Sequence, residues 1–395
     1  MPSILVFGAA NFYGRALTQL LCREREQQQQ QQKQAQDDAW EIRGVDKALP
    51  ALAAFPADVL ALYATIDYRM GNLRCGAFLE QAFRRDDGRR WDYVFNFACE
   101  LKFGQPDHVY DQDVRQLAAR IVQLAGAARA GVLVHLSTAL VLGGNSNAQC
   151  AEDAPGLAPG AGSVLAQCHA DAEASARAAG VPAVVLRPAL CYGPGDRQNA
   201  VPMLIMVQLS SASGDARMPV LWDKDVRIST VHVADVAAAA LAAARWRAAA
   251  AADVSPDQAT FNLADPGDTT NARLAQAVGA LFGVEPSFQN AAVSFLVKRL
   301  KTAELAEEVN QSLLGPWMDL LAAHGVANSP LSPYLDHEHP YCRLDAQPRG
   351  VDGARIARTP GLGFAYQHPR LDAAALREVV EEFQAVGLWP AIPLG

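Results

Sequence analysis

The fold is decided by the stretch SILVFGAANFYG, which occupies residues 3–14. Its first five residues form a short apolar run, and GAANFYG (residues 8–14) opens a helix-like stretch, RALTQLLCRER. A buried strand, a glycine-bearing turn and a helix make up a first βα unit. Glycines permit a tight turn there, and the free N–H groups of the helix N-terminus attract a pyrophosphate. The stretch predicts nucleotide binding, with an ordinary βα turn as the alternative.

Short apolar runs continue to alternate with helix-like stretches through the first half of the chain. The strand candidates are 40–45, 64–70, 93–97, 132–136 and 183–186, with helical stretches such as 114–130 and 163–179 between them. Strands that alternate with helices predict an α/β fold whose parallel sheet is covered on both faces.

Two segments depart from this alternation. A run of six glutamines, Gln27–Gln32, lies in a polar segment that reaches Asp38. Such a tract buries too little apolar area to offset its ordering entropy, so we expect a flexible insertion over residues 27–38. From residue 192 onward the alternation weakens. We expect 192–395 to be a mixed region, of which about 226–265 returns to the sheet core and the rest forms a smaller C-terminal lobe.

Composition limits the possible partners. The chain has 395 residues and a formal net charge of −8, which argues against binding to nucleic acid or to an anionic membrane. No apolar stretch is long enough to span a bilayer. The seven cysteines are scattered and contain no CxxC pair, which favours reduced thiols and a cytoplasmic protein. We expect a small-molecule substrate or a protein partner, and a homo-oligomer is compatible with the sequence.

Asp46, at the end of the second predicted strand, is placed to accept hydrogen bonds from an adenosine ribose. A carboxylate there favours NAD over NADP, because it would repel the ribose phosphate of NADP. Two neighbouring cations, Arg43 and Lys47, offer the opposite interpretation, since they would attract that phosphate.

Several passages together resemble the extended short-chain dehydrogenases/reductases, which include NAD-dependent epimerases and dehydratases and hydroxysteroid dehydrogenases. They cover residues 4 to about 240 in the order expected of that family. These passages are GAANFYG (8–14), MGNLR (70–74), VFNFA (94–98), LSTALVLG (136–143), LRP (186–188) with YGPG (192–195), and VHVADVA (231–237).

The resemblance implies a Rossmann-type, doubly wound parallel sheet, with residues 1–191 as the NAD(P)-binding domain and a smaller C-terminal substrate lobe. It also implies a set of cofactor-binding residues along the edge of the sheet. Those residues are Gly8, Asn11, Phe12 and Gly14 at the pyrophosphate, Asp46 at the ribose, Asn72 and Leu73 at the adenine, and Phe97, Ala98 and Pro188 along the middle and the nicotinamide. Asn11 stands where the family has a glycine, so its Cβ intrudes on the phosphate space.

The resemblance implies catalysis by a Tyr-x-x-x-Lys pair that is assisted by a Ser or Thr. Thr138 stands at the hydroxyl position. No tyrosine occurs between Tyr110 and Tyr192 and no lysine between Lys102 and Lys224. One register along the helical stretch, set by Glu173, puts Leu165 and His169 at the two places. A shift of two residues puts Ser163 and Gln167 there instead.

Two functions follow. In the first, the chain binds NAD(P) without the Tyr/Lys proton transfer and acts as a binding, sensor or structural protein. In the second, it is an active oxidoreductase, epimerase or dehydratase with a relocated acid or base, for which the candidates are Thr138, His169, or a loop tyrosine such as Tyr110 or Tyr192. No metal site is expected: DHEHPYC (336–342) is rich in possible ligands, but its spacing matches no closed zinc set. His135 reads as a core histidine.

Overall fold

The computed structural model describes residues 2–31, 40–143, 149–157, 162–220, 222–250, 254–288, 302–339, 341–342 and 350–395. A seven-stranded sheet forms its centre, with the strand order β11-β7-β5-β4-β1-β2-β3 and parallel pairing throughout. The strands are β1 Ser3–Phe7, β2 Glu41–Asp46, β3 Asp67–Met70, β4 Tyr93–Asn96, β5 Val132–Leu136, β7 Ala183–Pro188 and β11 Thr260–Leu263. The predicted α/β fold with a doubly wound parallel sheet is confirmed.

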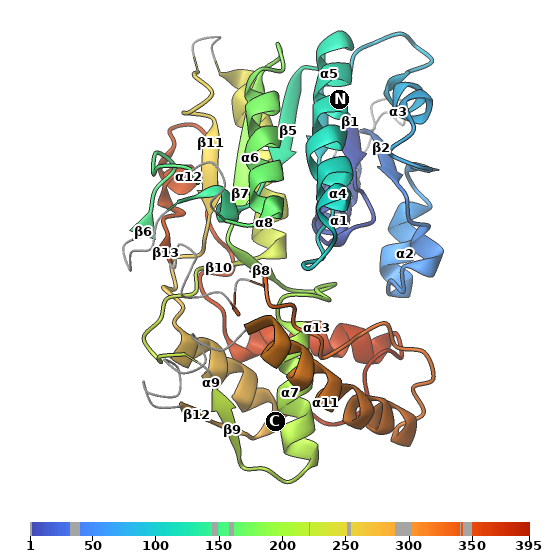
Figure 1. Cartoon of the computed structure of the whole chain (residues 1–395). Helices are drawn as coiled ribbons and strands as arrows, with labels where there is room; N and C mark the ends of the chain where they lie inside the picture. The colour runs from blue at the N-terminus through green and yellow to red at the C-terminus, as the bar shows by residue number, and fades with distance from the viewer. Residues whose placement is uncertain are drawn as a thin grey trace.

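Helices cover both faces of the sheet because its central strands are apolar on both sides. Ile4 and Val6 of β1 pack into one core, while Leu5 and Phe7 pack into another. The first face carries α1 and α8, which contact each other along their length. The second carries α3, α5 and α6 (Figure 1). These helices are α1 Phe12–Gln31, α3 Gly76–Phe83, α5 Leu117–Ala127, α6 Val164–Arg177 and α8 Val233–Ala249.

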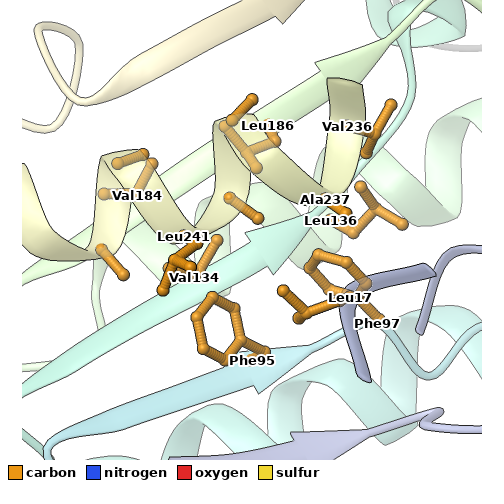
Figure 2. Packing of buried hydrophobic residues seen from close by; sticks show 14 of the residues in the cluster. Leu17, Phe95, Phe97, Val134, Leu136, Val184, Leu186, Val236, Ala237 and Leu241 are labelled. Atoms are coloured by element: carbon orange, nitrogen blue, oxygen red, sulfur yellow. The ribbon is translucent and has the colours of Figure 1, made fainter. Parts of the chain in front are cut away.

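The alanine-rich helix α8 lies close against the sheet because its small side chains leave room for the large residues of the strands. Figure 2 shows Leu241 of α8 above Phe95 and Val134, and Ala237 beside Leu136 and Phe97. The ring of Phe97 belongs to this core and is 1% exposed.

A second group of elements forms the C-terminal lobe, below the sheet in Figure 1. Its hydrophobic core is separate and includes the paired indoles of Trp317 and Trp389, whose ring centroids are 5.2 Å apart. The elements that contribute to this lobe are α7 Val201–Ala212, β9 Arg217–Val220, α9 Asn271–Phe282, β12 Glu285–Phe288, α11 Thr302–Ala323 and α13 Ala373–Ala385.

Shorter elements complete the described chain. They are α2 Ala57–Tyr63, α4 Asp107–Tyr110, β6 Gln149–Cys150, β8 Leu190–Tyr192, β10 Thr230–His232, β13 Gly350–Val351, α12 Ala354–Arg358, and the turns Pro50–Leu52, Asp111–Gln116 and Ala139–Val141. In the part of the chain that the structure describes, no helix is both long enough and apolar enough to cross a membrane.

The glutamine tract differs from the prediction over its first five residues. Helix α1 continues through Gln31, so residues 27–31 are helical and do not belong to an insertion. Glutamine has a favourable helix propensity, and Gln28 Oε1 also accepts a hydrogen bond from Trp40 Nε1 at 2.8 Å. The remainder of the predicted insertion, residues 32–38, lies outside the described residues.

Candidate functional site

The predicted cofactor-binding residues lie along one edge of the sheet. Because all seven strands are parallel, their carboxyl ends share that edge, and each predicted segment directly follows a strand. The strand order reverses between β1 and β4, so the glycine loop after β1 lies beside residues 97–98 after β4. A ligand crevice forms at such a switch point in open α/β sheets.

The glycine loop is held in a conformation that only glycine permits. Gly8 has φ +76°, and a Cβ there would lie 2.7 Å from the backbone of Phe97 and Ala98. A Cβ on Gly14 would overlap the carbonyl oxygen of Gly8. The two glycines therefore let β1, α1 and the β4 loop approach one another closely.

Asn11 stands at the loop position where a Cβ is expected to intrude on the phosphate space. Its side chain turns back into the loop, where Nδ2 donates to the Phe97 carbonyl at 2.7 Å and Oδ1 accepts from the Gly14 N–H at 2.9 Å. The asparagine thus caps α1 and ties the glycine loop to the end of β4. Within the described residues, the N–H groups of Phe12 and Tyr13, the first two of α1, keep no acceptor.

Asp46 is buried at the end of β2 and is already hydrogen-bonded to the loop. Its Oδ2 accepts from the Ala10 N–H at 2.9 Å and its Oδ1 from the Ala48 N–H at 3.0 Å. A carboxylate has about four lone-pair sites, so two remain for further donors.

The two cations beside Asp46 are engaged elsewhere. Arg43 is buried over the ring of Trp91, with its guanidinium carbon 4.9 Å from the ring centroid, and its Nε donates to Asp67 at 2.6 Å. Lys47 is exposed, and its Nζ lies 3.8 Å from a carboxylate oxygen of Glu100. Neither arrangement builds a phosphate site at Asp46.

The remaining predicted cofactor residues occupy the same edge with different exposures. Asn72 is exposed and its Oδ1 accepts from the Arg74 N–H at 2.9 Å, while Leu73 is buried. Ala98 and Pro188 are buried at the ends of β4 and β7. The expectation that Phe97 lines the cofactor fails for its ring, which lies in the core, so only its backbone borders the loop.

The acid/base candidate Thr138 is half-buried at the end of β5. Its hydroxyl oxygen accepts from the Leu140 N–H at 3.3 Å, so the side chain caps the turn Ala139–Val141. A threonine at a strand end is thereby partly satisfied by backbone.

Glu173 of α6 is the centre of a buried ion-pair network that ties this helix to the sheet. Its carboxylate accepts from the Ser137 hydroxyl at 2.6 Å, from Arg187 Nε at 2.8 Å and Nη2 at 2.7 Å, and from Arg177 at 3.0 Å. Burial alone raises the pKa of Glu173, but the hydrogen bonds and charge of Arg187 outweigh it and hold the pKa below its usual range. In the alternative register, Ser163 is the N-cap of α6 and accepts from the Ala166 N–H at 3.3 Å.

In the register set by Glu173, Leu165 lies two turns and His169 one turn before Glu173 on α6, and both are buried. The surroundings of His169 bear on its expected catalytic role, which stays a prediction. Burial, with a smaller contribution from His135, lowers the pKa of His169 to about 3, so its ring is neutral at pH 7. A short neutral ring inside the protein supplies neither the charge nor the reach of a lysine.

A small buried polar cluster lies between α6 and the sheet. Asn96 Nδ2 lies 3.2 Å from His135 Nδ1, and burial lowers the pKa of His135 to about 4. Among the described residues, Asn96 Oδ1, His135 Nε2 and His169 Nδ1 have no hydrogen-bond partner. His135 is the core histidine that the sequence suggested, but it is incompletely satisfied.

These buried histidines give the protein a predictable sensitivity to acid. An unfolded imidazole takes up a proton near pH 6.5, whereas His169 stays neutral in the folded protein until about pH 3. The unfolded state therefore binds the extra proton, and stability is lost as pH falls from 6.5. We expect His169→Gln to reduce the pH dependence of the free energy of unfolding by about 1.4 kcal/mol per pH unit between pH 6 and 5. Urea unfolding at each pH measures this slope.

The matched control is His108→Gln, at an exposed site on α4. An unchanged slope in His169→Gln would show that His169 is protonated in the folded protein.

The loop tyrosines named as alternatives are committed to backbone groups. Tyr110 donates to the Lys102 carbonyl at 3.0 Å and accepts from the Gln105 N–H at 2.9 Å, and burial raises its pKa to about 12. Tyr192 donates to the Arg370 carbonyl at 3.1 Å, in the C-terminal lobe. Neither is an available acid or base.

One phenol near the edge of the sheet was missed by the sequence analysis. Tyr13, the second residue of α1, lies near Cys99 and Cys191, and burial together with these groups raises its pKa well above the usual value. The GAANFYG motif predicts no role for the side chain at this position, so no sequence pattern pointed to Tyr13.

The DHEHPYC segment holds no metal cluster in its described part, residues 336–339 and 341–342. His339 is buried, its Nδ1 accepts from the Tyr341 N–H at 3.1 Å, and its ring packs edge-on against Phe103. His339 is thus held by contacts within the protein.

Comparison with family models and with curated proteins gives two results. A family model, the NAD dependent epimerase/dehydratase family, matches residues 4–264. No curated protein matches the chain.

Solved structures share the fold at low sequence identity. The structure described as gox2253 is 16% identical with a TM-score of 0.62, and the match covers 98% of this chain and all of that one. MoeE5 in complex with UDP-glucuronic acid and NAD is 19% identical with a TM-score of 0.54, covering 73% of this chain and 86% of that one. UDP-glucuronic acid 4-epimerase from Bacillus cereus in complex with NAD is 17% identical with a TM-score of 0.51, covering 72% and 87%.

Proposed function

This chain belongs to the NAD-dependent epimerase/dehydratase family, and we propose from that membership that it binds NAD without carrying out Tyr/Lys proton transfer. Its role is then that of a binding, sensor or structural protein built on the family's scaffold. The observation that carries the proposal is that α6 contains neither a tyrosine nor a lysine, so in either register, Leu165 and His169 or Ser163 and Gln167, the implied pair is missing.

The edge of the sheet fits NAD. Two N–H groups at the start of α1, those of Phe12 and Tyr13, are open to a pyrophosphate, and Asn11 is turned away from it. The remaining lone pairs of Asp46 suit ribose hydroxyls, and Arg43 is held away by Asp67. The 2′-phosphate of NADP would lie against the buried carboxylate of Asp46, and both Arg43 and Lys47 are engaged elsewhere. The site therefore favours NAD over NADP. When bound, NAD supplies a nicotinamide that accepts a hydride.

Among the residues described at this edge, the acid/base candidates of the sequence offer no strong proton acceptor. Thr138 retains a hydroxyl, but an ordinary hydroxyl needs a neighbouring base to move its proton. The imidazole of His169 is buried, and burial together with the neighbouring His135 lowers its pKa to about 3. The described residues thus support cofactor binding, but these candidates do not support proton transfer.

The alternative, an active enzyme with a relocated acid or base, is favoured by one observation. The Tyr13 phenol lies near Cys99 and Cys191, which follow two of the strand ends implied to line the cofactor. A protonated phenol at this position would serve as a general acid.

The test is to titrate the purified chain with NAD and with NADP by calorimetry. The NAD-loaded chain is then incubated with UDP-glucuronic acid, UDP-glucose, hydroxysteroids and small alcohols. Absorbance of reduced cofactor detects net oxidation, and chromatography detects epimers or dehydrated products. We expect micromolar affinity for NAD, weaker binding of NADP, and no product.

A product whose formation is lost in Thr138→Ala, His169→Ala or Tyr13→Phe would overturn the proposal and identify the relocated group. Absence of binding to both nucleotides would refute cofactor binding altogether.

A further inference from the structure

The C-terminal lobe contains a cavity of about 430 Å³ inside its hydrophobic core. Helices α7, α9 and α11 and strand β9 form its walls. Figure 1 shows these elements together in the C-terminal lobe, below the sheet. Val309 of α11 both lines the cavity and is 44% exposed, so the cavity reaches the surface beside α11.

The walls are apolar and adaptable. Three methionines, Met203, Met206 and Met218, line the cavity together with Leu274 and Val278. Methionine side chains are unbranched and polarisable, so they adjust to irregular apolar ligands. Half of the chain's six methionines gather here.

Most polar side chains of the walls are already hydrogen-bonded within the protein, and the partly exposed imidazole of His337 lies 3.6 Å from the Asp336 carboxylate. Asn310 donates to the Leu335 carbonyl at 3.1 Å and accepts from the Leu335 N–H at 3.0 Å. Ser210 donates to the Met206 carbonyl at 3.3 Å, and the Tyr341 hydroxyl to Asn271 at 3.3 Å. A ligand would therefore find few groups in need of a partner.

Charge is also missing from the walls. Among the described lining residues there is no Lys, Arg, Asp or Glu. Burial raises the pKa of the Cys342 thiol to about 12, which keeps this lining group neutral. A nucleoside diphosphate needs cationic or N–H partners for its phosphates, so this cavity does not suit one.

We propose that this cavity is a binding site for an uncharged apolar small molecule, such as a medium-chain alcohol or a hydrocarbon group of similar size. A cavity of about 150 Å³ with apolar walls stays dry and binds benzene, so this cavity, nearly three times as large, suits roughly fifteen to twenty non-hydrogen atoms. Because the site lies in the lobe core, it does not depend on the proposed binding of NAD.

The experiment uses the full chain and the uncharged fluorescent probe N-phenyl-1-naphthylamine. We expect a saturable rise in fluorescence with a dissociation constant in the micromolar range, reversed by 1-decanol and unaffected by NAD or UDP-glucose. Ala275→Phe fills the cavity from α9 and should weaken probe binding at least about tenfold, or about 1.4 kcal/mol. Ala280→Phe, the same substitution at an exposed position of α9, should leave it unchanged.

Thermal unfolding checks that each variant is folded. Should Ala275→Phe fail to fold, Val207→Phe on α7 fills the same cavity from another helix. The proposal is overturned by the absence of saturable binding, by displacement with NAD or UDP-glucose, or by equal affinity in a folded filled variant and the wild-type chain.

Discussion

Replacing Gly8 by alanine is expected to lower the affinity for NAD by about a hundredfold or more, equivalent to roughly 2.7 kcal/mol. At φ +76°, the added Cβ would lie 2.7 Å from backbone atoms of both Phe97 and Ala98. Backbone cannot rotate away as a side chain can, so the glycine loop must shift relative to β4. That shift moves the N–H groups of Phe12 and Tyr13 from the pyrophosphate position. Calorimetric titration with NAD measures the loss.

Gly88→Ala is the matched control for this substitution. Gly88 also has a left-handed backbone, with φ +67°, but a Cβ there would meet nothing within 4 Å. Both variants carry the conformational cost of alanine at positive φ, roughly 1–2 kcal/mol, and only Gly8→Ala carries the steric conflict. Unchanged NAD affinity in a folded Gly8→Ala variant would contradict the assignment of the glycine loop as the pyrophosphate site.

Removal of Glu173 is expected to have the largest effect on stability. The Glu173→Ala substitution leaves the Arg187 guanidinium, whose side chain is 10% exposed, without its bidentate carboxylate. An unpaired buried charge destabilises a protein by about 3–5 kcal/mol. Glu173→Gln keeps the shape but removes the charge, and we expect an intermediate loss. Urea unfolding at pH 7 measures both.

Asp171→Ala on the same helix is the control for the removal of a carboxylate. Asp171 is half exposed and pairs with exposed Arg115 at 3.2 Å, so its loss should cost less than about 1 kcal/mol. Because the pKa of Glu173 is depressed in the folded protein, its ionised form stabilises the fold above the unfolded pKa. The difference between Glu173→Ala and the wild-type chain should therefore shrink as pH falls below about 4. Equal losses in Glu173→Ala and Asp171→Ala would show that the buried network does not hold α6 to the sheet.

The architecture was predictable because it is written in local patterns. The apolar run Ser3–Phe7 and the glycines at 8 and 14 define a βα junction by themselves, and alternation of strands and helices then implies a parallel sheet. A parallel sheet brings the ends of its strands to one edge, so Asp46, Thr138 and Pro188 lie along the same edge although they are far apart in the chain. The absence of a Tyr-x-x-x-Lys pair was also a property of the sequence alone.

Other features depended on neighbours that no local pattern identifies. Asn11 was expected to crowd the phosphates, but the Phe97 carbonyl, 86 residues away, draws its side chain back. His169 looked titratable near pH 7, but burial between α6 and the sheet keeps it neutral. The glutamines at 27–31 were read as an insertion by composition, and in the structure they extend α1.

The sequence by itself determined the βα order, the nucleotide loop and the missing catalytic pair, because apolar periodicity and turn glycines act over a few residues. Only the tertiary structure decided which polar groups are satisfied, which histidines are buried, and that the C-terminal lobe contains an apolar cavity open to the surface beside α11. Hydrogen-bond satisfaction, protonation and empty volume depend on groups distant in the chain, and these are brought together only when the chain folds.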